Sequence, residues 1–370
     1  MRILYVTTIS LTMNTFFKPH VEMLVKEGHE VDIACNFRDM DLHELDSNLG
    51  CKIYQIDFSR VPISLGNMRS FAQLNNVVKN GNYDIVHCHT PNASVITRLV
   101  CRKLRRKNNL KVFYTAHGFH FYKGAPMLNW LVFYPIELFC SRFTDKLITI
   151  NKEDFELAKR KFKVKEIYYV PGVGIDLSKF RNIEINRVKK RCEIGVPENA
   201  FLIFSVGELN ENKNHQVVIR AMAKLKDSNL HYAIAGVGDK REYLLELASD
   251  LGVLEQLHML GYRKDVAELY KASDLFCFPS FREGLSASLM EAMASGLPCI
   301  VSYIRGNTDL INENGGRLFV PHDENALVAG LREVFAADTK NMGDQNRIMV
   351  EKFSLDTIKK QMLKIYMGES

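Results

Sequence analysis

The sequence predicts an α/β protein that consists of two doubly wound domains in series. Its 370 residues exceed the roughly 250–300 residues at which a single hydrophobic core stops growing. Short runs rich in β-branched and aromatic residues alternate with helical patterns in both halves, which is typical of a parallel sheet with helices on both faces. The segment Val-Pro-Gly-Val-Gly at 170–174 interrupts this alternation near the middle of the chain.

The first half opens on a buried strand pattern, RILYVTT at 2–8. A helical pattern near 15–26 follows it, and Gly28 ends that helix. The alternation continues in the same way, and it predicts strands at 30–35, 52–57, 83–90, 111–116 and 146–150, with helices near 67–80, 92–107, 127–142 and 152–162.

The second half starts after the Pro/Gly segment, with a polar stretch at 178–191 that we interpret as a hinge region. The domains are therefore predicted to be 1–175 and 176–353. Ligands bind beyond the carboxyl ends of the strands in open parallel sheets, so we expect the site in an interdomain cleft. The second domain has predicted strands at 201–206, 231–235, 257–260, 275–279 and 298–302, helices near 213–226, 240–250, 264–271, 286–295 and 323–337, and a tail helix at 354–366.

The composition is ordinary for a globular protein, with 46% hydrophobic and 25% charged residues. It excludes a disordered, collagenous or coiled-coil chain. No apolar run of about 18 residues occurs and the first residues lack a cleavage site, so neither a transmembrane helix nor a signal peptide is predicted. The eight cysteines are irregularly spaced, which favours reduced thiols and a cytoplasmic location over a disulfide framework.

Positive charge gathers in the first half, although the net charge of the chain is only +6. No acidic residue lies between Asp84 and Glu137. An anionic membrane surface, a phosphorylated acceptor or nucleic acid would suit such a segment, and a solvated helix face is the simpler alternative. The segment carries eight bases: Arg98, Arg102, Lys103, Arg105, Arg106, Lys107, Lys111 and Lys123.

The segment at 127–140 is apolar nearly all round and contains the only tryptophan, Trp130. It is too short to span a bilayer. Two interpretations are open: a core helix, or a partly exposed apolar surface beside the basic helix. Apolar insertion combined with basic attraction is typical of peripheral membrane binding. The candidate membrane or acceptor surface comprises Arg102, Arg105, Arg106 and Trp130.

The most specific motif reads Arg-Glu-Gly-Leu-Ser-Ala-Ser-Leu-Met-Glu at 282–291. Glu283 follows a predicted strand, and Glu291 lies eight residues later within the next helix. Between them, Gly284, Leu285 and Ser286 offer backbone N–H groups at a helix N-terminus, which attracts anions. Carboxylates beside such a terminus suit sugar or ribose hydroxyls. The alternative is that Glu283 only complements the helix dipole and Glu291 is solvated.

This segment, read with its surroundings at 278–302, resembles the E-x7-E signature of glycosyltransferase family 4. The resemblance extends over the whole chain, and it is strongest to the branch that builds capsular, exopolysaccharide or lipid-linked saccharides in bacteria. It implies a retaining, nucleotide-sugar-dependent enzyme of the GT-B fold, in which two Rossmann-like domains face each other across a cleft. Further matching segments are RILYVTT, DIVHCHTP at 84–91, TAHGFHFY at 115–122, VPGVGIDLSKF at 170–180, SVGELNENKNH at 205–215, LGYRKDV at 260–266 and NGGRLFVPHD at 314–323.

The resemblance implies a role for each matching residue. Glu283 would bind hydroxyls of the donor sugar near the anomeric centre, and Glu291 would hold the nucleotide ribose. Lys213, which follows a strand and opens a helix, would bind the diphosphate and offset the negative charge that develops on the leaving group. His117 would lie close to the donor sugar in the cleft; otherwise it is a core or surface histidine. The candidate catalytic residues are thus His117, Lys213 and Glu283.

Two departures from the family pattern affect the expected donor site. The family usually has arginine where this chain has Glu208, so either Arg263 supplies the missing cation, or Glu208 points away or binds the acceptor. Relatives often have a Gly-Gly pair in the first strand–helix loop, where this chain has Asn14 and Thr15. We expect Asn14 or Thr15 to cap a helix there and to bind donor or acceptor.

The resemblance also implies which domain binds which substrate. Residues 176–353 would bind a nucleotide sugar, UDP-linked by preference, and residues 1–175 would bind a saccharide acceptor, with 354–370 packing back on the first domain. The sequence shows no clear enzymatic nucleophile, which favours displacement on one face of the sugar. The transferred group would be a hexose or N-acetylhexosamine, and the acceptor would be linked to a lipid diphosphate. The enzyme would then work in the cytoplasm at the inner face of the membrane.

Neither a cofactor nor a metal is predicted. His87 and His89 share one strand face, but no Cys or carboxylate cluster accompanies them, so we interpret them as residues at the sheet end that line the cleft. Nucleic acid is not an expected partner, because no groove-reading motif occurs. Two rival functions stay open: a nucleotide-sugar 2-epimerase or phosphorylase of the same fold, and a non-catalytic membrane- or polyanion-binding relative.

Overall fold

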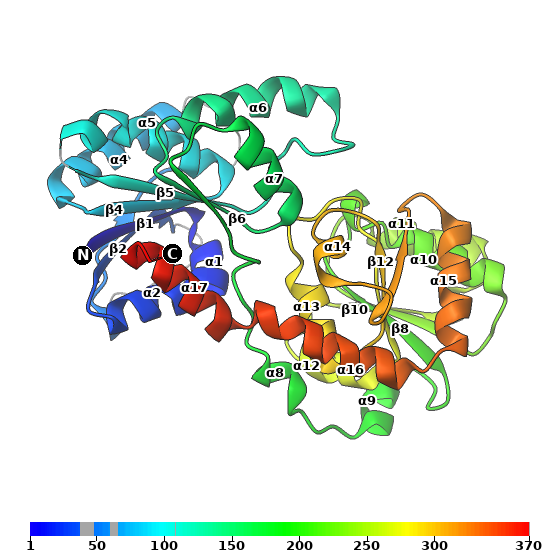
Figure 1. Cartoon of the computed structure of the whole chain (residues 1–370). Helices are drawn as coiled ribbons and strands as arrows, with labels where there is room; N and C mark the ends of the chain where they lie inside the picture. Colours follow the sequence, from blue (N-terminus) through cyan, green and yellow to red (C-terminus); the bar gives the residue numbers. More distant parts are fainter. Residues whose placement is uncertain (38–47, 60–65, 108, 370) are drawn as a thin grey trace. The chain divides into compact units, whose positions relative to one another are not determined.

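The computed structural model describes residues 1–37, 48–59, 66–107 and 109–369. The chain divides into two compact units, which we call unit 1 and unit 2 (Figure 1). Unit 1 comprises Met1–Val173 together with Ile358–Ser370, and unit 2 comprises Gly174–Thr357. Each unit is a parallel sheet with helices on both faces, as the alternating sequence pattern predicts.

Unit 1 contains a seven-stranded parallel sheet of order β3-β2-β1-β4-β5-β6-β7. The strand order reverses between β1 and β4, which makes their carboxyl ends the switch point at which such sheets bind ligands. Thr8 and Thr90 share a 2.6 Å hydrogen bond there. The strands are β1 (Arg2–Ile9), β2 (Glu30–Asn36), β3 (Ile53–Gln55), β4 (Ile85–His89), β5 (Lys111–Ala116), β6 (Lys146–Thr149) and β7 (Glu166–Tyr169).

Two hydrophobic cores hold the helices of unit 1 to this sheet. One core lies under α4, α5 and α6, and the other lies under α2 and the C-terminal helix α17 (Figure 1). The helices are α1 (Ser10–Thr12), the π-helix η1 (Met13–Phe17), α2 (Lys18–Lys26), α4 (Gly66–Gly81), α5 (Pro91–Lys107), α6 (Met127–Ser141), α7 (Lys152–Lys161) and α17 (Leu355–Met367).

The first helical segment differs from the prediction. The backbone becomes helical directly after β1, at Ser10, and Ile9 occupies the N-cap position without a side-chain cap. Asn14 and Thr15 lie inside the π-helix η1, so the prediction that one of them caps a helix is wrong. The reason is packing: the wide turn buries Met13 and Phe17 under the sheet, which the local sequence preferences do not reveal.

Unit 2 contains a six-stranded parallel sheet of order β10-β9-β8-β11-β12-β13. The strands are β8 (Phe201–Val206), β9 (Leu230–Ala235), β10 (Leu257–Gly261), β11 (Leu275–Phe278), β12 (Cys299–Ser302) and β13 (Gly316–Phe319). The helices are α8 (Ser178–Arg181), α9 (Arg187–Glu193), the 3-10 helix η2 (Glu211–Lys213), α10 (Gln216–Leu225), α11 (Arg241–Asp250), η3 (Leu254–Gln256), α12 (Val266–Ala272), α13 (Ala287–Ser295), α14 (Asn307–Leu310), α15 (Glu324–Ala336), α16 (Thr339–Met349) and η4 (Val350–Phe353).

The stretch at 178–191 is part of unit 2 and forms the short helices α8 and most of α9, whereas its composition predicted a hinge. Arg191 explains why it folds onto the unit. Its side chain is 2% exposed, its guanidinium pairs with Asp274, and it donates hydrogen bonds to the carbonyls of Glu198, Ala200 and Ala272. Arg191 therefore holds this charged stretch to unit 2, because folding brings its partners close from other positions in the sequence.

Among the described residues, no helix combines the length and the apolar character that crossing a bilayer requires.

Candidate active site

Lys213 and Glu283 meet at the carboxyl edge of the unit 2 sheet. Lys213 ends η2 after β8, Glu283 follows β11, and these two strands are neighbours in the sheet. The Nζ atom of Lys213 donates a 2.8 Å hydrogen bond to Oε1 of Glu283 and lies 4.7 Å from the centre of the Phe278 ring. Both side chains are less than a fifth exposed, so the pair is only partly screened by water.

Asparagine side chains hold the two loops in register. The side-chain amide of Asn212 donates to the carbonyl of Arg282 at 3.0 Å, and the backbone carbonyl of Asn212 accepts from the backbone N–H of Phe281 at 2.8 Å. Asn214 adopts a left-handed backbone conformation and donates to the carbonyls of Pro279 and Pro321. The residues on either side of Lys213 are thus held by hydrogen bonds, which keeps the charge of Lys213 in a fixed position before a ligand binds.

Two glycines permit the close backbone approach at this edge. A Cβ atom on Gly207 would lie 3.1 Å from Cε of Lys213, so the lysine side chain passes directly over this residue. A Cβ atom on Gly306 would lie 2.1 Å from the carbonyl oxygen of Gly284, and Gly306 also has a φ of +81°. Glycine at 306 is therefore required both by the backbone conformation and by the loop that carries Glu283.

The loop of Glu283 leads into the N-terminus of α13. Ser286 is the N-cap, and its side chain accepts a hydrogen bond from the backbone N–H of Leu289. Gly284 and Leu285 precede the cap, as the sequence predicts. The positive end of this helix adds to the charge of Lys213, so the sheet edge can bind an anionic group while Glu283 accepts hydrogen bonds from hydroxyls.

Glu291 lies one turn further along α13, partly buried. The hydroxyl of Tyr270, from α12, donates to Oε2 of Glu291 at 3.1 Å and to the carbonyl of Ser288 at 3.0 Å. Burial raises the pKa of Glu291 above its ordinary value, and the hydrogen bond from Tyr270 opposes this shift. A ligand that donates hydroxyl hydrogens to this carboxylate would stabilise its charged form.

The structure places the other two predicted donor residues in different surroundings. Arg263 follows β10, two strands away from β8, and its guanidinium is held by the carboxylates of Glu193 and Asp265. Glu208 is exposed, and its carboxylate accepts a 3.0 Å hydrogen bond from Asn210. The contacts of Arg263 are therefore those of a structural ion pair, and no local sequence pattern indicates both of its acidic partners.

Arg305 is a cation that the sequence analysis missed. It follows β12, is only 9% exposed, and its Nε atom donates to the backbone carbonyl of Glu283 at 3.3 Å. Arg305 therefore braces the loop that carries Glu283 from the neighbouring strand end. A signal existed in the sequence, because an arginine followed by glycine directly after a strand marks a loop at the same sheet edge.

His117 lies in unit 1, directly after β5. Its Nε2 atom is 3.2 Å from Nδ1 of His89, and its ring packs against that of Phe17 at 5.4 Å between centres. Burial lowers the pKa of His117 to about 4. The imidazole is therefore neutral near pH 7, where it can donate or accept a hydrogen bond but carries no charge.

His87 and His89 are buried, which corrects the expectation that they line an open site. Their side chains are 0% and 1% exposed. His87 is hydrogen-bonded to the hydroxyls of Tyr366 and Thr115, and burial holds the pKa values of both histidines well below the ordinary value. Within the described ranges, no group of three or more His, Cys, Asp or Glu side chains is arranged to hold a metal ion.

The predicted basic surface is only partly a surface. Arg102 and Arg106 are exposed on α5. Arg105 is instead bound through two guanidinium nitrogens to Asp145, with a side chain 14% exposed, so its expected outward position is corrected. Trp130 is partly buried, and its indole donates to the carbonyl of Tyr122 at 3.3 Å. Arg105 is therefore held by a partner forty residues away, and Trp130 by a carbonyl in the loop before its own helix.

Comparison with known families matches both units. Residues 2–151 match the family described as glycosyl transferase 4-like, and residues 186–349 match glycosyl transferases group 1. Among curated relatives, the protein EpsD of Bacillus subtilis, a glycosyltransferase by assignment, is 33% identical over 99% of this chain and 96% of its own. The UDP-Gal:α-D-GlcNAc-diphosphoundecaprenol α-1,3-galactosyltransferase of Escherichia coli is 28% identical over 88% of this chain and 85% of its own.

Solved structures share the fold at low sequence identity. The sucrose-phosphate synthase of Thermosynechococcus elongatus superposes with a TM-score of 0.82 at 18% identity, covering 100% of this chain and 99% of that one. HepE of Anabaena, solved in complex with UDP, superposes with a TM-score of 0.78 at 18% identity, covering 100% of both chains. With both units matched and a relative above 30% identity along nearly the whole length, the chain belongs to glycosyltransferase family 4 and has its GT-B fold.

Proposed function

We propose that this glycosyltransferase moves a hexose or N-acetylhexosamine from a UDP-sugar to a saccharide acceptor carried on a lipid diphosphate. The product would be part of a bacterial surface polysaccharide or lipid-linked glycan, and the anomeric configuration would be retained. Two relatives support the substrate classes: the galactosyltransferase of Escherichia coli is named for a UDP-sugar and a diphosphoundecaprenol acceptor, and HepE was solved with UDP.

The observation that carries the proposal is the contact between Lys213 and Glu283. In a nucleotide sugar, the β-phosphate and the sugar are joined through one oxygen atom, which is bonded to C1. A cation and a carboxylate 2.8 Å apart are therefore spaced so that one contacts the phosphate and the other contacts the sugar. Lys213 and the N-terminus of α13 would stabilise the charge that develops on the leaving UDP.

The mechanism that we propose is displacement on one face of the sugar. The bond between C1 and the diphosphate oxygen breaks, the acceptor hydroxyl oxygen bonds to C1 on the same face, and a diphosphate oxygen takes the hydroxyl proton. The position of Glu283 supports this mechanism, because the hydrogen bond from Lys213 lowers the nucleophilicity of its carboxylate. No cofactor or metal takes part in this proposal, so transfer should continue in the presence of a chelator.

The acceptor would bind to unit 1 and reach the enzyme from an anionic membrane surface. The exposed bases Arg102, Lys103 and Arg106 on α5 support peripheral attachment. His117 is the residue that we assign to the sugar near the reacting bond, since it is neutral and stands beyond the carboxyl end of β5. Figure 1 shows the two units that would share the substrates.

The test is a thermal-shift panel of UDP-sugars and GDP-sugars, followed by an acceptor screen with NMR of the product. A ligand at 100 times its Kd adds about 2.7 kcal/mol of stability, which raises Tm by a few degrees. We expect a shift with one UDP-sugar that is lost in Glu291→Ala and kept in Glu333→Ala, a control at an exposed carboxylate paired with Arg317. A shift with GDP-sugars alone, or an inverted product, would contradict the donor or the mechanism.

A further inference from the structure

Unit 1 contains an apolar cavity beneath α4, α5 and α6. Its volume is about 410 Å³. Most of its lining side chains are aliphatic or aromatic without a polar group, among them Phe71, Val95, Leu99, Phe121 and Ile136. An apolar cavity of about 150 Å³ is large enough for benzene, so this one has room for on the order of ten to fifteen carbon atoms.

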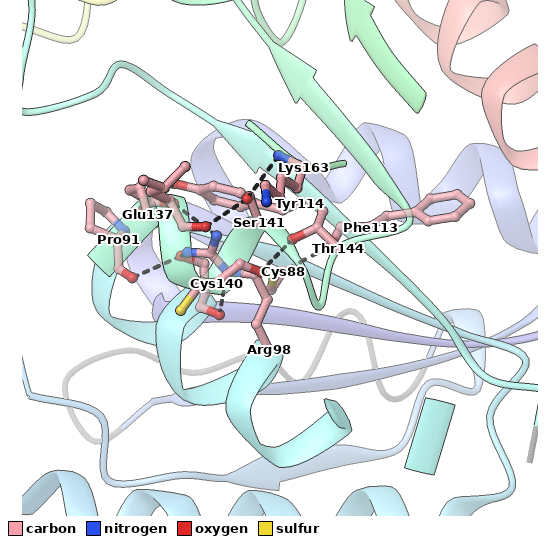
Figure 2. A network of polar contacts seen from close by, with 12 residues as sticks. Cys88, Pro91, Arg98, Phe113, Tyr114, Glu137, Cys140, Ser141, Thr144 and Lys163 are labelled. Carbon is pink, nitrogen blue, oxygen red and sulfur yellow. Dashed lines mark hydrogen bonds and ion pairs between the residues drawn. The ribbon is translucent and has the colours of Figure 1, made fainter. Parts of the chain in front are cut away.

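Glu137, an acidic side chain in the wall of this cavity, is neutralised by Arg98. Figure 2 shows Arg98 of α5 beside Glu137 of α6 and Tyr114 of β5. Nη1 of Arg98 donates to Oε2 of Glu137 at 2.8 Å, and the guanidinium lies 4.2 Å from the centre of the Tyr114 ring. The arginine also donates to the carbonyl and hydroxyl of Ser94. Because Glu137 is already paired, the cavity favours an uncharged, apolar occupant.

A second, more polar cavity continues from the first. It has a volume of about 260 Å³ and shares four lining residues with the apolar one, namely Pro91, Asn92, His120 and Phe133. Its other walls include three threonines at or after the ends of β1 and β4: Thr8, Thr12 and Thr90. The pair of cavities therefore runs from the ligand-binding edge of the sheet to an apolar interior, which is the shape of a site for an amphiphile.

Exposed apolar side chains lie on two of the helices that form this cavity, α4 and α6. On α6, Met127, Leu128 and Leu131 are 72%, 67% and 68% exposed, and Glu137, the only acidic residue of this helix, is buried. Met68 on α4 is 74% exposed. Unit 1 therefore carries exposed apolar side chains on α4 and α6 and exposed bases on α5, the two kinds of group that bind an anionic membrane.

We infer that the cavity beneath α4, α5 and α6 holds the first part of the hydrocarbon chain of a membrane-borne lipid diphosphate, whose polar head occupies the cavity beside Thr8 and Thr90. This inference rests on the proposed function for the identity of the acceptor. The inference adds to the proposed function a site for the hydrocarbon chain, so that an acceptor with a long chain is bound more tightly than one with a short chain.

Trp130 provides a binding measurement that does not depend on catalysis. It is the only tryptophan of the chain, and its ring centre lies 5.5 Å from that of Phe121, which lines the cavity. We expect farnesyl diphosphate to change the fluorescence of the full-length protein in a saturable way. Inorganic diphosphate, which has the charge but no chain, should cause no such change.

The variant Val95→Phe fills the cavity from α5, and Val188→Phe makes the same substitution at an exposed position of α9 in unit 2. Val95→Phe should weaken farnesyl diphosphate binding at least tenfold, whereas Val188→Phe should not. If Val95→Phe unfolds, Ile136→Glu gives the same test, because Ile136 lines the cavity and is 39% exposed. Equal binding in the wild type and both cavity variants, or no saturable signal, would overturn the inference.

Transfer assays separate this inference from the proposed function. With acceptors of long and short hydrocarbon chains, Val95→Phe should lower the ratio of kcat/KM values, long over short, at least tenfold. Farnesyl diphosphate binding without any transfer from UDP-sugars would contradict the proposed function and leave the chain-binding site standing. Transfer at equal kcat/KM to long and short acceptors in the wild type would contradict the chain-binding site alone.

Discussion

At the scale of single residues, the candidate donor site depends on how the charge of Lys213 is held. Its hydrogen bond to Glu283 spans two strand ends, and Arg305 braces the same loop from a third. The family resemblance implied roles for Lys213 and Glu283, and their positions after predicted strands agree with it. It did not predict Arg305 or the ion pairs of Arg263, because an ion pair between residues far apart in sequence leaves no local pattern.

Replacing Lys213 by alanine should lower kcat/KM for transfer at least tenfold, which is about 1.4 kcal/mol of transition-state stabilisation. The loss should appear mainly in kcat, since the lysine faces charge that develops on the leaving group. Lys224→Ala is the matched control: Lys224 also pairs with a glutamate at 2.8 Å, but its side chain is 44% exposed and lies in the last turn of α10. Kinetics of Lys213→Ala equal to those of Lys224→Ala would remove Lys213 from the mechanism.

At the scale of elements, the C-terminal helix α17 belongs to unit 1 although it follows unit 2 in the chain. Ile358, Met362, Ile365 and Tyr366 are buried in the core under the unit 1 sheet. The hydroxyl of Tyr366 also contacts His87 in the middle of β4. The amphipathic pattern predicted this helix, but only the family resemblance indicated which domain it joins, because any apolar face would accept it.

Truncating Ile358 to alanine should lower the free energy of unfolding by 2–5 kcal/mol, because its side chain is fully buried and leaves a cavity. Lys360→Ala, at an exposed position of the same helix, should stay within about 0.5 kcal/mol of the wild type. Urea denaturation followed by circular dichroism measures both. Equal stabilities of the two variants would show that α17 adds nothing to the core of unit 1.

At the scale of the whole molecule, both units bury histidines in the neutral form. Burial lowers the pKa of His20 to about 4 in unit 1, and it lowers the pKa of His215 to about 3 and of His258 to about 4 in unit 2. The unfolded chain therefore binds more protons than the folded one between pH 4 and 6.5. We therefore expect the contribution of these histidines to the free energy of unfolding to be complete above pH 6.5 and to be lost as the pH decreases through this window.

The contribution of His20 to this pH dependence of stability can be measured separately. It is 4% exposed and hydrogen-bonded to the carbonyl of Val173 at 2.7 Å. Its shift from 6.5 to about 4 corresponds to about 3 kcal/mol of stability at neutral pH that is lost by pH 4. His20→Gln keeps a hydrogen-bond donor without a titrating group, so its denaturation midpoint should fall less between pH 7.5 and 4.5. The control is His322→Gln, at an exposed position. If the denaturation midpoint of His20→Gln falls with pH as much as those of the wild type and of His322→Gln, this account is refuted.

The sequence by itself determined the two α/β halves, most strand and helix positions, and the residues that lie at the sheet edge of unit 2. It did so because buried strands, helix caps and glycines leave short-range patterns, as Glu283 and Ser286 show. Only the tertiary structure decided that Asn14 sits within a helix, that 178–191 anchors unit 2, and that Arg105 and Arg263 are held in ion pairs. These outcomes depend on partners that folding brings together from distant positions, and no local spacing records them.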